Sequence, residues 1–474
     1  MNKYKQLRSW LAHLAETNRL VATHENVSLR HQLAAIAKKL DGKSATLFPN
    51  PDGHHIPVVS GFMSSRSWIA EAMGIDEAKL LDEFRKAADN PIACKLVENA
   101  PCQEVRHQDF DMRTLLPVPT HSEHDSGPYI TAGLVIARNP KTGIQNVSIN
   151  RIQVNSKDHM AVLILPRHLH AFQQAAEELN QPLPVAVVIG VDPLTLLASQ
   201  AIAPIDFDEL EIAGALHGEA LNVVRCISNE VRVPADAEIV IEGHIPPKLR
   251  ELEGPFGEYP KYYSSQEKRQ VIVVDMVTHR KSPIFHTIVP AELEHLLLGS
   301  IPREATILSY LRRSFPGVLD VHLSLGGVGR YHLYVQIKKT HEGIPKNVIA
   351  GAFSSHYDVK HVVVVDEDVD VHDPSQVEWA IATRFQAKRD LVMIEDAQGS
   401  VLDPSTTVSL PVDQNGVIPA RYQGMSSKLG FDATKPLVYE GHVFTKIKIP
   451  GEDEVDLDVV LDRQFPISSI LKLN

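Results

Sequence analysis

The runs ITAGLVIA (130–137), NVSINRIQV (146–154) and MAVLIL (160–165) are rich in valine and isoleucine and are separated by turn residues. β-Branched residues favour the pleated sheet, so each run predicts a strand. Five similar runs follow: PVAVVIG (184–190), VVRCIS (223–228), AEIVIEG (237–243), QVIVVDMV (270–277) and PIFHTIV (283–289). Together they predict one large sheet or barrel, with helices inserted near 168–179 and 207–217.

Helical patterns flank this region. Residues 1–100 look mostly helical, with leucines at helical spacing from Leu29 to Leu40 and Ser28 as the expected N-cap. A helical run at 301–315 follows the strands. Beyond it, strand-like and helical segments alternate, which predicts an α/β domain followed by a packed, extended tail.

Length, charge and cysteine content restrict the class of protein. The 474 residues predict two or three domains, and the net charge of −12 disfavours a nucleic-acid partner, which selects for a basic surface. No apolar run approaches the roughly 20 residues of a membrane span, and no signal peptide is apparent. The three cysteines form no CxxC pair, which fits a reducing compartment. We therefore expect a soluble cytoplasmic protein.

Several common catalytic motifs are absent from the sequence. GGVGR (326–330) has the wrong spacing for a dinucleotide-binding loop. GxxxxGK[ST], GxSxG and HExxH do not occur, which disfavours nucleotide kinases, elbow-type serine hydrolases and zincins.

The segment EGPFGE places Glu253 and Glu258 five residues apart across a loop that contains Gly254, Pro255 and Gly257. Such a loop can direct both carboxylates into one cavity, where one of them acquires a raised pKa and carries a proton near neutral pH. The alternative interpretation is a solvated acidic turn.

Arg151 interrupts an otherwise apolar strand run and needs an acidic partner if it is buried. Glu253 or Glu258 would serve. In an ideal strand Asn146 and Arg151 point to opposite faces, so they share a pocket only if the strand bulges or Asn146 lies at its end. The alternative is a surface arginine.

A third candidate is Pro166-Arg167-His168, which opens a helix. An amide, an imidazole and a carboxylate together suit Mg²⁺ or Mn²⁺ bound to a phosphate. The candidate carboxylates are Asp206, Asp208, Glu209 and Glu211. The alternatives are an acidic helix N-terminus and a packed histidine, and sequence spacing does not bring these groups together.

Eight segments, in order along nearly the whole chain, resemble the UbiD family of reversible decarboxylases that use prenylated FMN (prFMN). They are NVSINR (146–151), PRH (166–168), GVDP (190–193), DELEIAGALHG (208–218), CISNEVRVPADAEIVIEG (226–243), EGPFGE (253–258), HVVVVDEDVDV (361–371) and SKLGFDAT (427–434).

This resemblance implies a mixed α/β fold with four parts. They are an N-terminal α/β region (1–110), a split β-barrel of the flavin-reductase type for the cofactor (111–300), a linker helix (301–318), and a C-terminal α/β oligomerisation domain with a tail (319–474). It also implies a homo-oligomer, either a dimer or a hexamer, and a separate flavin prenyltransferase that supplies the cofactor.

The resemblance also assigns site residues. Asn146, His168 and Glu209 would hold Mn²⁺ or Mg²⁺ at the cofactor phosphate, with K⁺ nearby. Glu258 would be the proton donor, and Glu253 would pair with Arg151. Further cofactor contacts would come from Ile149, Asn150, Arg151, Lys360 and Arg167, although some members carry glutamine at the last position.

The implied reaction removes CO₂ from an aromatic, heteroaromatic or α,β-unsaturated acid through a covalent substrate–cofactor adduct. LEHLLLGSIPRE (293–304) is similar to the branch acting on furan and pyrrole carboxylates, where His295 and Arg303 would hold a second carboxylate or a ring substituent. Gly299 and Pro302 favour a helix break between them, and the alternative is a packed His295 with a solvated Arg303.

Two other functions compete with a decarboxylase. One is an FMN-dependent oxidoreductase on a flavin-reductase barrel, and the other is a non-catalytic flavin-binding member of the family. Hydride transfer to a flavin does not need the Glu253/Glu258 pair, which favours the decarboxylase.

Overall fold

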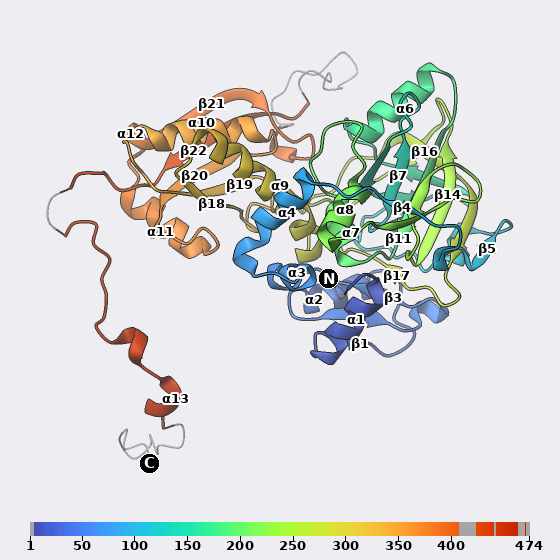
Figure 1. Cartoon of the computed structure of the whole chain (residues 1–474), viewed down its shortest axis with the longest axis horizontal. Coiled ribbons are helices and arrows are strands. Elements are labelled where there is room, and N and C mark those ends of the chain that lie inside the picture. Colours follow the sequence, from blue (N-terminus) through green and yellow to red (C-terminus); the bar gives the residue numbers. More distant parts are fainter. Residues whose placement is uncertain (1–3, 407–422, 440–441, 463–469, 471–474) are drawn as a thin grey trace.

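A ten-stranded sheet forms the middle of the chain (Figure 1). The computed structural model describes residues 4–406, 423–439, 442–462 and 470. The strand order along the sheet is β6-β9-β10-β16-β14-β11-β7-β8, and β5 and β15 both pair with β16. The strands are β5 (Val105–His107), β6 (Tyr129–Ile130), β7 (Leu134–Arg138), β8 (Gln145–Ile149), β9 (Ile152–Val154), β10 (His159–Val162), β11 (Leu183–Ile189), β14 (Ile239–Ile245), β15 (Arg250–Glu253) and β16 (Glu267–His279).

This sheet curls into a half-barrel. Strand β8 ends the order on one side and β9 lies near the other end, yet only Asn150 and Arg151 separate them in sequence. Two intervening residues span only ~10 Å, so the two ends of the sheet approach each other at this point. The predicted barrel is confirmed as a curled half-barrel. The single strand expected over 146–154 is wrong, because the chain leaves one end of the sheet and enters the other.

Helices follow the strands of this region. They are α5 (Met112–Leu115), α6 (His168–Glu178), α7 (Pro193–Ala198) and α8 (Glu209–His217). The two inserted helices expected near 168–179 and 207–217 are thus confirmed as α6 and α8.

Two of the eight predicted strands belong to other sheets. The run 223–228 supplies β12 (Asn222–Arg225), which pairs with β13 (Arg232–Pro234) and β4 (Lys95–Leu96). The run 283–289 supplies β17 (Phe285–His286), which pairs in parallel with an N-terminal strand. A strand pattern shows that a segment is extended but does not identify its partner, so the prediction of a single sheet was wrong for both.

The N-terminal region combines helices with a four-stranded sheet of order β1-β2-β3-β17, so the prediction that residues 1–100 are mostly helical was wrong. Helix α2 begins after His31 and not after the expected Ser28, because residues 28–31 form a turn in which His31 has a φ of +69°. The expected helix ending at Gly74 is confirmed. The elements are α1 (Leu7–Glu16), β1 (Leu20–Ala22), α2 (Gln32–Leu40), β2 (Ala45–Phe48), β3 (Val58–Ser60), α3 (Arg66–Met73) and α4 (Leu80–Asp89).

Helix α9 (Leu293–Ser314) joins the central and C-terminal regions as one continuous helix. The expected break at Gly299 and Pro302 was wrong. The Arg303 side chain donates to the Gly299 carbonyl oxygen (2.5 Å), and Gly299 leaves space for a guanidinium described below. Most of the helix is buried, so tertiary packing overrides the local breakers. The domain bounds given above stay predictions.

The C-terminal region contains a five-stranded sheet of order β18-β19-β20-β22-β21. Residues 442–462 extend away from this body (Figure 1). Most of their side chains are exposed, with Ile447 98 % exposed, so the expected tail is extended. It contacts its own subunit through Lys446, whose Nζ donates to the Asp368 carbonyl oxygen and lies 4.8 Å from the centroid of the Trp379 ring. The elements are β18 (Val318–Leu323), β19 (His332–Ile337), α10 (Ile344–Ser355), β20 (His361–Asp366), α11 (Pro374–Arg384), α12 (Ala387–Asp390), β21 (Leu391–Gln398), β22 (Met425–Asp432) and α13 (Leu457–Val460). Within the described parts of the chain, no helix has the length and hydropathy needed to cross a membrane.

Candidate active site

Arg151 lies where the chain passes from β8 to β9, between the two ends of the curled sheet, a place called the split below. Its side chain binds both carboxylates of the Glu253/Glu258 loop. Its Nε and Nη2 donate to the two oxygens of Glu253 (2.9 and 2.7 Å), and its Nη1 donates to Glu258 Oε1. Glu253 ends β15, and Gly254 turns the chain with a φ of +87° where a Cβ would lie 2.5 Å from the Ser265 carbonyl oxygen. Only glycine fits this turn, which brings Glu258 back to the same arginine.

Burial determines how this group ionises. Glu253 is fully buried and also accepts a hydrogen bond from the Tyr129 hydroxyl (3.0 Å). Burial raises the pKa of Glu258, and the positive charge of Arg151 only partly offsets this effect. Glu258 can therefore carry a proton closer to neutral pH than an exposed glutamate. The solvated turn and the surface arginine are both wrong as interpretations.

Asn146 and Glu209 form a second buried pair. Asn146 Nδ2 on β8 donates to Glu209 Oε1 (2.8 Å), and the Val147 amide donates to Glu209 Oε2 (2.7 Å). Glu209 opens α8, where Asp208 caps the helix. Burial raises the pKa of Glu209 to about 8. An amide and a carboxylate buried together suit a hard cation, which would compensate the cost of burying the charge.

His168 and Arg167 open α6 but do not join this pair. Among the described residues, His168 makes no hydrogen bond to Asn146 or Glu209, and no three His, Cys, Asp or Glu side chains are grouped as a metal site. Arg167 instead reaches the C-terminal region, where its Nη2 donates to the Tyr357 hydroxyl (2.9 Å). The structure therefore brings two of the three predicted metal ligands together.

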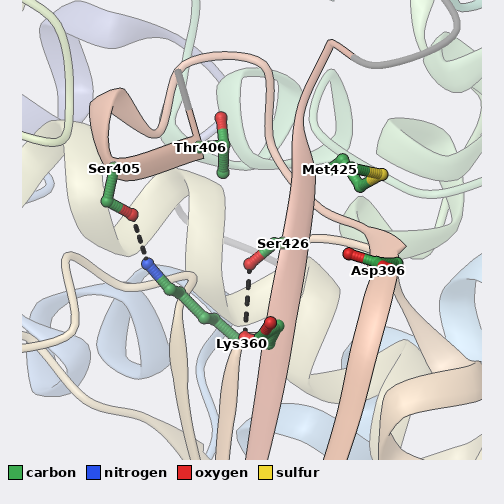
Figure 2. Close-up of a pocket in the computed structure, with 7 residues that line it drawn as sticks. Lys360, Asp396, Ser405, Thr406, Met425 and Ser426 are labelled. Atoms are coloured by element: carbon green, nitrogen blue, oxygen red, sulfur yellow. Dashed lines mark hydrogen bonds between the residues drawn. The ribbon is translucent and has the colours of Figure 1, made fainter. Parts of the chain in front are cut away.

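Three further predicted cofactor residues, Ile149, Asn150 and Lys360, lie in the barrel or in the C-terminal region. Asn150 Nδ2 donates to the Leu163 carbonyl oxygen (2.9 Å), which fixes the split between β8 and β9, and Ile149 ends β8. Lys360 Nζ donates to Asp403 Oδ2 and Ser405 Oγ (both 2.7 Å). Lys360 and Ser405 line a pocket of about 310 Å³ in the C-terminal region, and Figure 2 shows the hydrogen bond between them. Lys360 is thus not brought to the Asn146–Glu209 pair.

Arg303 is buried on α9, only 3 % exposed, which contradicts a solvated residue. Its Nε donates to His356 Nε2 (3.3 Å), and its Nη2 lies 3.6 Å from Asp358 Oδ2. Burial and the nearby charge of Arg330 lower the pKa of Arg303 to about 9. His295 is also enclosed: its Nδ1 accepts from the Ala291 amide (3.1 Å), and burial lowers its pKa to about 3.

Sequence analysis missed Arg330, His356 and Asp358. All three lie in loops of the C-terminal region. Asp358 Oδ2 is their common contact with Arg303 of α9, and it lies 4.0 Å from Arg330 Nη1. The guanidinium groups of Arg303 and Arg330 thus share one carboxylate, which favours an anionic ligand. In the sequence, Arg330 lies in the glycine-rich segment GGVGR (326–330), which was tested only against the pattern of a dinucleotide-binding loop.

The barrel therefore holds a bidentate arginine–carboxylate group and, on the same stretch of chain, a buried amide–carboxylate pair. Together they define an acid–base site on a curled half-barrel. Three domain families match the chain: the N-terminal (residues 11–88), Rift-related (95–293) and C-terminal (296–433) domains of 3-octaprenyl-4-hydroxybenzoate carboxy-lyase. The chain therefore belongs to the UbiD family of carboxy-lyases.

Known relatives cover nearly the full length. The UbiD-class enzyme HmfF from Pelotomaculum thermopropionicum, solved in complex with FMN, is 46 % identical, with a TM-score of 0.91 over 96 % of this chain and 100 % of that one. An evolved dimeric form of HmfF in complex with prFMN is 43 % identical, with a TM-score of 0.88 over the same shares. Anhydromevalonate phosphate decarboxylase from Methanothermobacter thermautotrophicus is 38 % identical over 91 % of this chain and 97 % of its own length.

Proposed function

We propose that this protein catalyses the reversible, non-oxidative decarboxylation of an aromatic, heteroaromatic or α,β-unsaturated carboxylic acid with prFMN. The observation that carries this proposal is the buried Glu253–Arg151–Glu258 group at the split of the barrel. The complexes of HmfF with FMN and with prFMN support the choice of cofactor.

Within this proposal Glu258 is the proton donor. When bound, prFMN supplies an electrophilic carbon that accepts the electron pair released as CO₂ leaves. Glu258, whose pKa burial raises, delivers a proton to the carbon that lost the carboxyl group. Arg151 orients Glu258 and balances the charge of Glu253. The buried setting keeps water from competing for the proton.

Asn146, Glu209 and His168 would hold Mn²⁺ or Mg²⁺ at the cofactor phosphate, with K⁺ nearby. The buried amide–carboxylate pair fits such a cation, and the half-buried His168 begins the neighbouring helix. Ile149, Asn150, Arg167 and Lys360 are the remaining proposed cofactor contacts. For Lys360, the proposal requires that its ammonium group give up its hydrogen bonds to Asp403 and Ser405 and bind a phosphate instead.

The first experiment is native mass spectrometry of the protein co-expressed with a flavin prenyltransferase, the proposed supplier of the cofactor. We expect FMN heavier by one five-carbon prenyl unit, together with Mn²⁺. His168→Ala should lose most of both, because a cation site that loses one of three protein ligands binds far more weakly. His170→Ala, on the same helix, is the matched control and should keep both.

Plain FMN, or no flavin, in a folded and metal-loaded protein would favour the oxidoreductase or the non-catalytic flavin binder. Full metal occupancy in His168→Ala would remove this histidine from the site. The same spectra give the oligomeric state. We propose a homo-oligomer, a dimer or a hexamer, in which the exposed aliphatic side chains of residues 442–462 become covered by a neighbouring subunit.

For the substrate we propose a furan or pyrrole carboxylate whose second carboxylate or ring substituent contacts His295 and Arg303. The buried, partly uncompensated charge of Arg303 supports this choice. We expect Arg303→Met to lower kcat/KM for furan-2,5-dicarboxylate by about 10- to 100-fold, the effect of losing one buried charged hydrogen bond. The effect on 2-furoate should be several-fold smaller.

The control for this comparison is Arg313→Met, which changes an exposed arginine on the same helix. This variant should leave kcat/KM unchanged for both substrates. Equal losses on the mono- and dicarboxylate in Arg303→Met would contradict a contact with the second carboxylate.

A further inference from the structure

Tyr259 directly follows the proposed proton donor and is buried against the C-terminal region. Its hydroxyl lies 3.1 Å from the Tyr331 hydroxyl and 2.7 Å from Ser400 Oγ. Both partners belong to the C-terminal region, whereas Tyr259 belongs to the barrel loop. The hydroxyl of Tyr259 is therefore satisfied entirely across the junction between the two regions.

Arg330, the neighbour of Tyr331, contacts the same tyrosine from another side. Its guanidinium carbon lies 4.3 Å from the centroid of the Tyr259 ring, in a cation–π contact. The rings of Tyr259 and Tyr331 meet edge to face at 5.8 Å. Two consecutive residues thus hold both the face and the hydroxyl of Tyr259.

The loop that carries Arg330 and Tyr331 packs closely against neighbouring backbone and side chains. Val328 and Gly329 both have positive φ angles (+54° and +63°), and a Cβ on Gly327 would lie 2.5 Å from His332 Cβ. On the facing helix, a Cβ on Gly299 would lie 2.9 Å from Arg330 Nη2. A side chain at Gly299 would press on the Arg330 guanidinium, and one at Gly327 would displace His332 and with it the loop that carries Arg330. GGVGR therefore has a structural purpose other than binding a nucleotide.

The backbone around Tyr331 and Tyr259 is also fixed. The Tyr331 carbonyl oxygen accepts from the amides of Lys360 and His361 (2.9 and 2.8 Å), which anchors it to β20. The Glu258 amide donates to the Tyr262 carbonyl oxygen, and the Lys261 amide donates to the Glu258 carbonyl oxygen (both 2.9 Å). Glu258 and Tyr259 thus belong to one tight turn, and a shift of Tyr259 displaces the carboxylate beside it.

We propose that Arg330, Tyr331 and Ser400 are positioning residues that act through Tyr259. By holding Tyr259, the docked C-terminal region fixes Glu258 against Arg151 and closes it from water. Proton delivery is then efficient only while the two regions are in contact. This inference rests on the proposed role of Glu258, and it adds residues from the C-terminal region to a site otherwise built by the barrel.

The test compares Tyr331→Phe, Tyr259→Phe and the double variant, with Tyr310→Phe as the control, since Tyr310 is exposed on α9. Each single variant removes only a hydroxyl, so we expect kcat for decarboxylation to fall about tenfold with KM within threefold. The double variant should be no worse than Tyr259→Phe alone, because removing the Tyr259 hydroxyl already removes its contact with Tyr331. Ser400→Ala gives a second, smaller probe if a tyrosine variant folds poorly.

Hydrogen–deuterium exchange of the cofactor-free protein supplies a readout that does not depend on turnover. Backbone exchange of residues 253–263 should rise in the tyrosine variants and stay unchanged in Tyr310→Phe. Unchanged exchange in Tyr331→Phe and Tyr259→Phe would overturn the inference, and so would raised exchange with an unaltered kcat. If Glu258→Gln retains full activity, the proposed proton donor is wrong. The positioning of Tyr259 by the C-terminal region is then tested by the hydrogen–deuterium exchange of residues 253–263 alone.

Discussion

Glu258→Gln is expected to lower kcat for decarboxylation by roughly 10²- to 10⁴-fold, the range typical of removing a general acid. Glutamine keeps the size of the side chain and an oxygen that can accept from Arg151, but it has no proton to deliver to carbon. The contacts of Glu253 with Arg151 do not involve the substituted group. We therefore expect prFMN content and thermal stability close to those of the wild type.

The measurements are CO₂ release, cofactor mass and melting temperature on the same preparation. Glu267→Gln is the matched control, because it makes the same change at an exposed position on β16 and should leave kcat unaltered. Undiminished decarboxylation by Glu258→Gln would eliminate this residue as the proton donor.

Arg151→Met is expected to lower the free energy of unfolding by about 3–5 kcal/mol in addition to abolishing activity. The arginine is the bidentate partner of Glu253, which is fully buried. Without it, the carboxylate is left uncompensated in a setting that cannot hydrate it. Urea denaturation of the cofactor-free protein measures this loss.

The companion variant Arg151→Met/Glu253→Gln separates charge burial from packing. Removing the second charge should recover a substantial part of the lost stability, because a neutral amide costs far less to bury than a carboxylate. Activity should stay absent, since Arg151 no longer orients Glu258. A single variant as stable as the wild type would mean that Glu253 is neutral or finds another partner.

Local sequence patterns predicted much of the fold. Runs of valine and isoleucine correctly identified most strands of the half-barrel, and Gly74 correctly ended a helix. These features depend on backbone preferences and side-chain spacing within a few residues, so the sequence carries them directly. The interpretation of EGPFGE as two carboxylates directed to one place likewise rested on local turn chemistry.

Partners distant in sequence could not be predicted in this way. The strand at 285–286 joins the N-terminal sheet, although its composition resembles that of the barrel strands. Helix α9 continues through Gly299 and Pro302 because burial and the packing of Arg330 outweigh their local preference to break it.

The sequence by itself singled out the candidate residues: one arginine inside an apolar run, two glutamates around a glycine turn and, in separate segments, Asn146 and the acidic run 206–211. Only the tertiary structure decided that Arg151 lies at the split of the barrel between both glutamates, and that Arg330 and Tyr331 arrive from the other region to hold Tyr259. The physical reason is that burial and charge pairing depend on three-dimensional neighbours, which short-range patterns do not specify.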